Sequence, residues 1–318
     1  MIRALAILLL ILLISIVAAA TFGTATISWR DVVAGSETAR TIMLDIRLPR
    51  VLLAALVGAA LAAAGVTFQT LLRNPLADPF ILGISGGAAC GAAIVTAIGL
   101  ARVPGVVSVV AFIGALGATG GVILLARRRE SIDPTRLLLS GLVLNALFTA
   151  IILIAYALAP TSDLAMALRW MMGTLFAATW SDVLLLLAFL IVTMVVLTII
   201  AGDLRMLAFG EDDAKSRGVD VERVKLIGFA ASSIATGAAV AVSGIIGFVG
   251  LLVPHLIRLI WRRDFRTLLP LSAVGGAILL VLADLASRVA LPSADLPLGA
   301  FTAILGVPFF LSLLRRGR

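Results

Sequence analysis

Long apolar segments, separated by charged or Pro/Gly-containing breaks, are the feature that most restricts how this chain can fold. A helix needs roughly 20 mainly apolar residues to cross the hydrocarbon core of a bilayer. The mean hydropathy of +1.19 excludes a soluble domain, because a water-facing surface needs many more polar side chains. Strand-like alternation is absent, so the spans are predicted to be helices. We predict an all-α polytopic membrane protein, one domain over 1–318, with about ten transmembrane helices near residues 4–22, 50–72, 80–99, 105–126, 136–159, 181–201, 226–243, 248–261, 268–286 and 298–314.

The first apolar segment and the distribution of charge predict the orientation. A cleaved signal peptide would have a core of about 7–15 apolar residues. The run in MIRALAILLLILLISIVAAA is longer, which favours a retained span. Placing the N-terminus inside puts most of the 25 lysines and arginines in the cytoplasm, as the positive-inside rule requires. We therefore expect both termini to be cytoplasmic, and the net charge of +8 to reflect topology rather than nucleic-acid binding.

A weak internal similarity predicts inverted-repeat-like halves. GAALAAAG at 58–65 and GAAVAVSG at 237–244 share five of eight residues, although chance similarity between alanine-rich helices is the alternative. The two stretches lie five predicted spans apart, and an odd offset inverts the second copy, as in many transporters. Gly58, Ala62 and Gly65 fall on one helix face, which favours close helix packing over substrate contact.

Most catalytic chemistries are disfavoured by the residues present. GISG at 83–86 matches the G-x-S-G of intramembrane serine proteases, but such an enzyme needs a histidine within reach of Ser85. The single histidine, His255, is predicted near the cytoplasmic face, away from the serine. Neither Lys215 nor Lys225 fits a phosphate-binding G-x-x-x-x-G-K-[ST] loop, so any ATP would be bound by another chain. We predict no enzymatic activity, no cofactor and no metal site in this chain.

Two polar features are better explained as structure or as docking. Asp284, the clearest carboxylate within a span, precedes Arg288 by four residues, which predicts an ion pair rather than a proton relay. The segment at about 203–225 is the longest polar stretch on the predicted cytoplasmic side. Gly218 is suited to end a short acidic helix and Asp220 to cap the next one. A docking surface for a soluble partner and a plain solvated loop are both compatible with this pattern.

Several long motifs, in one order along nearly the whole chain, resemble the permease subunits of bacterial ABC importers of the FecCD type. The matching stretches are RLPR (47–50), QTLLRNPLADPFILGISGGA (69–88), RLLLSG (136–141), RWMMGTL (169–175), LAFGEDDAKSRGV (207–219), GFVGLLVPHLIRL (247–259), LLPLSAVGGAILLVLADLASR (268–288) and DLPLGAFTAILGVPFFLSLL (295–314). The resemblance implies a type II importer permease in a bacterial or archaeal inner membrane. It also implies a homodimer of permeases, two ATP-binding subunits, and a periplasmic or lipid-anchored substrate-binding protein.

The resemblance also implies roles for particular residues. Coupling to the ATPase would fall to Glu211, Asp212, Ala214, Arg217, Gly218 and Val219, and a cytoplasmic gate to Asn74, Pro75, Leu76 and Thr135. Arg47, Arg50 and Arg288 would receive acidic residues of the binding protein, although Arg47 and Arg50 could instead anchor a helix end at the headgroups.

The substrate path is expected to include Arg169, Trp170 and Met172 near the outer mouth. A cation beside aromatic and polarisable side chains suits a bulky ligand with carboxylates. Haem and anionic ferric siderophores have this character, whereas WMMG also resembles cobalamin permeases and Arg169 could simply pair with Asp163 or with lipid. An iron chelate or haem is preferred, and cobalamin is the alternative.

Overall fold

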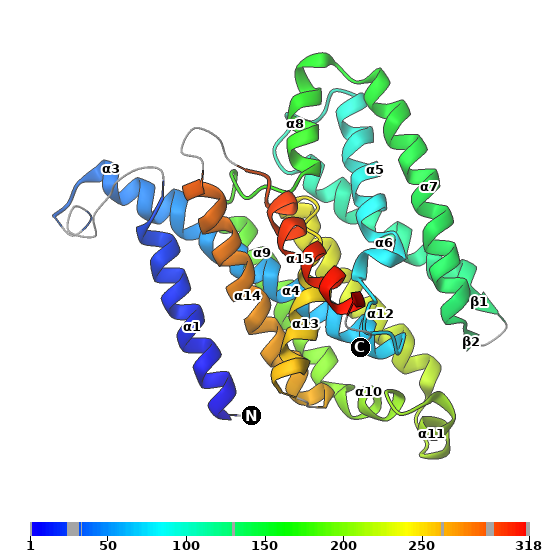
Figure 1. The fold of residues 1–318 in the computed structure, drawn as a ribbon. Coiled ribbons are helices and arrows are strands. Elements are labelled where there is room, and N and C mark those ends of the chain that lie inside the picture. The colour runs from blue at the N-terminus through cyan, green and yellow to red at the C-terminus, as the bar shows by residue number, and fades with distance from the viewer. Residues whose placement is uncertain are drawn as a thin grey trace.

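The computed structural model describes residues 2–23, 32, 34–128, 131–261, 264–290 and 296–315, and helices make up most of this part of the chain (Figure 1). In chain order, the elements are α1 (Ile2–Thr21), α3 (Glu37–Arg40), the π-helical η1 (Thr41–Arg47), α4 (Leu48–Leu71), the 3-10 turn η2 (Pro79–Leu82), α5 (Ile84–Ala97), α6 (Val106–Ala126), β1 (Arg127–Arg128), β2 (Ser131–Ile132), α7 (Pro134–Leu158), α8 (Thr161–Met171), α9 (Trp180–Ile199), α10 (Ala201–Leu207), α11 (Glu211–Ser216), α12 (Val221–Ser243), α13 (Val249–Ile260), α14 (Phe265–Ala290) and α15 (Leu298–Arg315).

Every predicted span falls on a helix, but not all of these helices are long. In the described part of the chain, 7 stretches are long and apolar enough to cross a membrane: α1, Glu37–Leu71, α6, α7, α9, α12 and α14. The helices α5, α13 and α15 are shorter apolar helices. The expected helix at 80–99 is wrong in extent, because Gly83 adopts a left-handed φ of 73° between η2 and α5.

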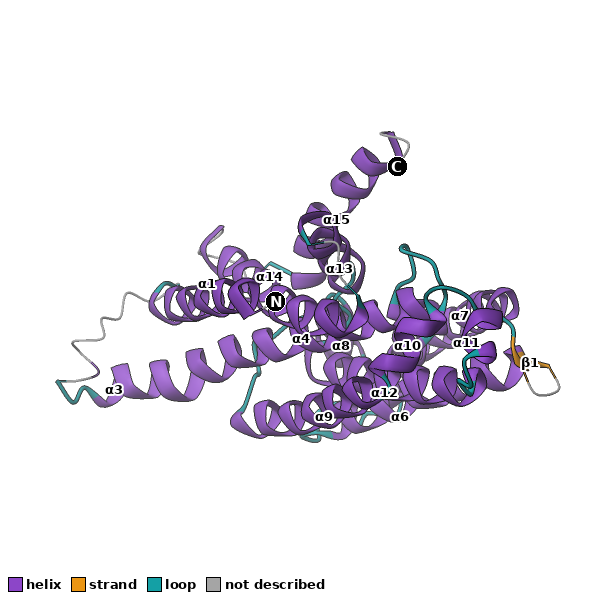
Figure 2. Cartoon of the chain, turned by 90° about the horizontal axis from the view of Figure 1, so that it is seen from below, coloured by secondary structure: helices purple, strands orange, loops and turns teal. Residues whose placement is uncertain are grey.

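Helix α4 forms the centre of the subunit, and Figure 2 shows it between α13 and α14 on one side and α9 and α12 on the other. A Cβ atom added at Gly58 would collide with the carbonyl oxygen of Gly276 in α14. One added at Gly65 would collide with the carbonyl oxygen of Gly250 in α13. These glycines therefore allow direct backbone contact between helices, which confirms the packing role predicted for them.

The two similar glycine- and alanine-rich stretches lie on helices that pack against each other. The 58–65 stretch is in α4, and the 237–244 stretch runs through the end of α12. Phe68 and Phe229 extend the contact between these helices, with ring centroids 5.5 Å apart. An inverted relation between the halves stays a prediction.

A second group of helices, α5 to α8, stands beside this centre (Figure 1). Gly87 in α5 and Gly114 in α6 again bring two backbones together, because each glycine faces the carbonyl oxygen of the other. The antiparallel strands β1 and β2 connect α6 to α7. Helix α8 and these strands were not predicted, because they are too short to cross a membrane.

Candidate translocation and coupling sites

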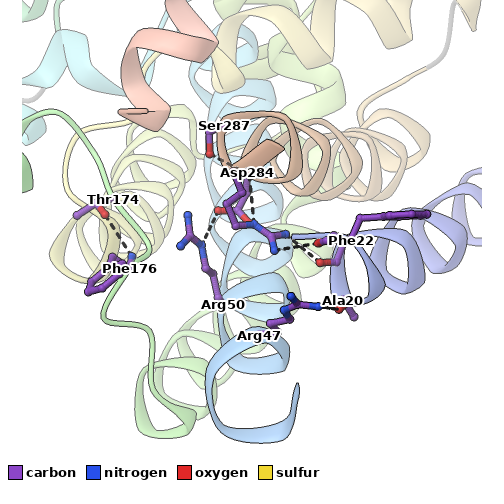
Figure 3. A network of polar contacts seen from close by, with 10 residues as sticks. Ala20, Phe22, Arg47, Arg50, Thr174, Phe176, Asp284 and Ser287 are labelled. Atoms are coloured by element: carbon purple, nitrogen blue, oxygen red, sulfur yellow. Dashed lines mark hydrogen bonds and ion pairs between the residues drawn. The ribbon is translucent and has the colours of Figure 1, made fainter. Parts of the chain in front are cut away.

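A buried network of arginines and one carboxylate joins α1, α4 and α14 (Figure 3). Asp284 is fully buried; its Oδ1 accepts a hydrogen bond of 2.8 Å from Arg50 Nε, and its Oδ2 lies 3.0 Å from Arg288 Nε. The second contact is an ion pair without the alignment of a hydrogen bond. The predicted pair of Asp284 and Arg288 is confirmed, and the same carboxylate also binds Arg50.

Arg47 at the end of η1 and Arg288 in α14 close the C-terminal end of α1. Arg47 Nη1 donates to the carbonyl oxygens of Ala20 and Thr21, at 3.2 and 3.0 Å. Arg288 Nη2 donates to the carbonyl of Ala19 at 2.9 Å, and its Nη1 to that of Phe22 at 3.3 Å. The last carbonyls of a helix lack internal partners and carry partial negative charge, so guanidinium groups stabilise them. These contacts make α1 an integral part of the fold.

The expected docking arginines therefore differ in their surroundings. Arg47 and Arg288 are each 6% exposed and hold the end of α1 through its carbonyls, which differs from the headgroup anchoring by Arg47 and Arg50 given as the alternative. Arg50 is less buried and lies between Asp284 and the loop that carries Thr174 and Phe176 (Figure 3). Binding-protein docking at these three positions stays a prediction.

Arg50 and Arg169 line one cavity of about 390 Å³ at the end of the molecule where α8 lies. The other lining residues are Met172, Gly173, Thr174, Leu175, Phe176, Leu296, Pro297 and Leu298. This described lining contains two guanidinium groups and no carboxylate. Arg169 is exposed, and Asp284 holds Arg50 through Nε. The cavity thus combines positive charge with apolar and thioether surface, which suits an anion with a bulky apolar body.

Two details correct the expected surroundings of Arg169. Asp163 does not pair with Arg169, since its Oδ1 binds Arg102 Nη2 at 2.7 Å and Nε at 2.9 Å. Trp170 is not among the cavity-lining residues; it is half-buried against the core, and its carbonyl oxygen faces Gly244. Of the three predicted substrate-path residues, Arg169 and Met172 are at the cavity.

The predicted gate residues occupy a turn after α4 and the start of α7. Asn74 Oδ1 accepts a hydrogen bond of 2.9 Å from Leu76 N, which satisfies a backbone group next to Pro75 as expected. Thr135 lies in the first turn of α7 rather than in an interhelical turn, and α7 packs against η2. The Asn74 turn precedes η2 in sequence, and α7 contacts η2 at Gly141, six residues after Thr135, so a gate formed by these residues stays a prediction.

Asp78 is an additional polar residue of this turn that the sequence did not single out. Its Oδ1 accepts a hydrogen bond of 2.8 Å from Phe80 N and so caps η2. Burial raises the pKa of Asp78 to about 6, and the hydrogen bond from Phe80 opposes this shift. The fold therefore favours the neutral form of this carboxyl group more than water does.

The polar segment folds as predicted, into a short helix and a tight turn before the next helix. Gly218 has a φ of 82°, and Val219 N donates to the carbonyl of Ala214 at 3.1 Å, which closes the end of α11. Asp220 caps α12 by accepting a hydrogen bond of 3.1 Å from Arg223 N. Ala214 is buried, whereas Asp212, Arg217 and Gly218 are exposed. The segment therefore presents charged side chains on a locally rigid turn.

Lys225 fixes this segment to the neighbouring elements, a role that sequence reasoning did not assign to it. The side chain is 2% exposed, and Nζ lies 2.9 Å from Glu211 Oε1 and 3.2 Å from Glu222 Oε1. It also donates to the carbonyl of Ile132 in β2 at 3.2 Å, while Ile132 N donates to Glu222 Oε2 at 2.8 Å. One ammonium group thus joins α11, α12 and the β1–β2 connection. The sequence feature that could have indicated this role is a lysine in the first turns of an apolar span.

The alternative of an intramembrane protease is not supported by the positions of its two residues. Ser85 lies at the start of α5, where it lines an open cleft with Asn145 and Thr149 of α7. His255 lies in α13, and its ring packs against Phe309 and Phe310 of α15 at centroid distances of 5.7 and 6.3 Å. No hydrogen bond connects Ser85 with His255 among the residues that the structure describes.

Helices that span a bilayer, a charged cavity at one end and a charged rigid turn at the other are the features of a transport permease. Comparison with known proteins agrees: residues 9–316 match the model of the FecCD transport family, and the chain belongs to this family. The hemin transport system permease protein HmuU of Yersinia pestis is 41% identical over 98% of this chain and 95% of its own. The vitamin B12 import system permease protein BtuC of Vibrio cholerae is 42% identical over 89% of this chain and 85% of its own.

A solved structure supports the same assignment at the level of the fold. It is described as an inward-facing conformation of a proposed metal-chelate type ABC transporter. Its chain is 28% identical, with a TM-score of 0.89 over 99% of this chain and 100% of that one. The protein is thus the permease of an ABC importer, with the fold of a type II importer permease.

Proposed function

We propose that this permease moves an anionic iron chelate, either haem or a ferric siderophore, across the inner membrane. The observation that carries the proposal is the joint presence of Arg50 and Arg169 in one cavity whose described lining has no carboxylate. Exposed Arg169 suits a ligand carboxylate, because arginine binds carboxylate through parallel hydrogen bonds, and Arg50 adds positive charge because it shares the single carboxylate of Asp284 with Arg288. The apolar and thioether side chains beside them suit the body of such a ligand. A metal-chelate transporter and a hemin permease among similar proteins support the same class of substrate.

The transport cycle is proposed to be alternating access by a homodimer of this chain. Two ATP-binding subunits would engage α11 and the Gly218 turn, and a periplasmic or lipid-anchored binding protein would deliver the substrate near Arg50. Hydrolysis of ATP would take place in the partner subunits, and both termini would be cytoplasmic. Charged groups at both contacts would steer and orient the partners, an effect that is strongest at low salt. Binding of the delivery protein and of ATP would then bias the outward- and inward-facing arrangements.

The test is ATP-dependent uptake into liposomes that contain the permease with its own ATPase and binding protein. Haem, a ferric siderophore and cobalamin are compared as substrates, in the wild type and in Arg169→Ala. Arg40→Ala is the matched control, because Arg40 is exposed on the same predicted side and does not line the cavity. We expect uptake of haem or siderophore that falls about ten-fold or more in Arg169→Ala, the loss that one charged hydrogen-bonding partner commonly produces, and that is unchanged in Arg40→Ala.

The alternative is a cobalamin importer, and the vitamin B12 permeases among similar proteins support it. Uptake of cobalamin alone, with equal rates in the wild type and Arg169→Ala, would refute the anionic substrate and leave the importer assignment intact.

A further inference from the structure

A second cavity, of about 460 Å³, lies on the side of the subunit that carries the coupling segment. Helices α4, α10, α13 and α14 surround it, and six of its ten described lining residues are polar. The polar residues are Gln69, Thr70, Arg73, Arg205, Arg258 and Asp264; the apolar residues are Ala208, Phe209, Phe265 and Leu268. Three guanidinium groups thus face a single carboxylate.

The partners of these arginines leave positive charge in the cavity. Arg258 donates to Gln69 Oε1, and Gln69 is neutral. Arg205 lies 3.5 Å from Asp264, and both side chains are partly exposed, so this pair neutralises one charge only. Arg73 makes no ion pair within the described residues. An anion that enters the cavity would therefore gain charge-assisted hydrogen bonds without breaking a strong ion pair.

The backbone of Arg73 sets where its side chain lies relative to the coupling segment. Arg73 ends α4 with a φ of 47°, in the left-handed conformation that usually selects glycine. This conformation closes the helix, because Asn74 N donates to the carbonyl of Gln69 at 3.1 Å. In this conformation its guanidinium lies beside Gly210, the residue that precedes α11. Phe209, which is 72% exposed, extends the apolar side of the cavity to the same point.

We propose that this cavity binds the phosphate of an anionic phospholipid from the cytoplasmic leaflet and that the bound lipid steadies the coupling segment. The arginines would bind the phosphate, and Phe209, Phe265 and Leu268 would contact the glycerol and the first acyl carbons. Basic pockets between transmembrane helices on the cytoplasmic side bind anionic headgroups in this way. The proposal rests on the orientation given under the proposed function. It is independent of the identity of the imported substrate.

The experiment measures retained phosphatidylglycerol by native mass spectrometry of the complete permease and ATPase complex. The complex is purified from bilayers of phosphatidylcholine mixed with phosphatidylglycerol. Arg73→Gln/Arg205→Gln is compared with the wild type and with Arg3→Gln, an exposed arginine at the same end of the molecule that does not line the cavity. We expect retention to fall about five-fold for each cavity arginine removed and to remain unchanged in Arg3→Gln. The charge-preserving variant Arg73→Lys/Arg205→Lys should retain more lipid than the glutamine variant.

Three outcomes would overturn the proposal. Equal retention in the glutamine double variant and Arg3→Gln would show that these arginines do not hold lipid. Displacement of the lipid by added inorganic phosphate would identify a site for a free anion instead. Retention that appears only after the ATPase has been removed would show that a group of the ATPase fills the cavity in the complex. Substrate uptake is not measured in any of these arms, so an error in the proposed substrate would leave the result unaffected.

Discussion

Replacement of Lys225 by methionine is the most direct test of how the coupling segment is held. Methionine keeps an unbranched chain of similar length in the 2%-exposed site but removes the ammonium group. Three contacts are lost at once: those with Glu211, with Glu222 and with the carbonyl of Ile132. Helix α11 then has no ionic link to α12, and the two glutamates that remain repel each other.

The magnitude follows from the exposure of the partners. Removing one member of a fully buried ion pair costs about 3–5 kcal/mol, because the other charge is left without compensation. Glu211 and Glu222 have side chains that are 24% and 28% exposed, so water solvates part of their charge after the substitution. Methionine also avoids the cost of burying an ammonium group. We therefore expect a loss of about 1–3 kcal/mol in the free energy of unfolding, concentrated at α11.

The assay compares thermal unfolding of the purified permease with the ratio of substrate imported to ATP hydrolysed in liposomes. Lys215→Met is the matched control, because Lys215 is the other lysine of the chain and is exposed on α11. Lys225→Met should unfold a few degrees lower and import less substrate per ATP, whereas Lys215→Met should unfold like the wild type. If both variants had the wild-type unfolding temperature and transport ratio, the anchoring role of Lys225 would be refuted.

Three further predictions concern single positions. Gly218→Val should strain a left-handed turn that has open space around it, and should therefore lower transport per ATP. Gly218→Asn should retain most coupling in the same assay, because asparagine tolerates this φ. Equal transport per ATP in the two variants would refute the role of the turn. The neutral form of Asp78 is favoured by the fold, so its contribution to stability is complete below pH 3.8 and is lost as pH rises through about 6. Thermal unfolding of Asp78→Asn, which keeps a cap acceptor, should therefore lack this pH dependence and gain at most about 3 kcal/mol at pH 7.5; parallel pH profiles would contradict this. Gly58→Val should collide with the Gly276 carbonyl and lower the free energy of unfolding by about 1–3 kcal/mol or more, as measured by thermal unfolding, and a stable, fully assembled variant would contradict the backbone contact.

The sequence predicted well those features that depend on lipid and on local chain geometry. The positions of the apolar spans follow from the length of a bilayer-crossing helix. The Gly218 turn and the Asp220 cap follow from backbone preferences of single residues. The pair of Asp284 and Arg288 follows from helical spacing, and it too was found as predicted.

Features that depend on contacts distant in sequence could not be predicted. Lys225 binds a carbonyl 93 residues away, at Ile132, and no local pattern marks that partner. The burial of Arg47 results from the position of α1 against α4 and α14, which hydropathy does not determine. Trp170 was assigned to the substrate path by its neighbours in sequence; its packing against the core could not be read from them, and its place in the path stays a prediction.

The arginines at the end of α1 also have a consequence for biogenesis. Phe22 and the Arg288 that binds its carbonyl are separated by 266 residues. At a synthesis rate of about 5–20 residues per second, roughly 13–50 s pass before the ribosome has made the partner of a helix that was inserted first. During that interval Arg47 can already bind the carbonyls of Ala20 and Thr21, whereas those of Ala19 and Phe22 must be hydrated. The contact of α14 with the first span is therefore expected to form late in synthesis, with α15 still to follow, and chains truncated before Arg288 should expose α1 to membrane proteases.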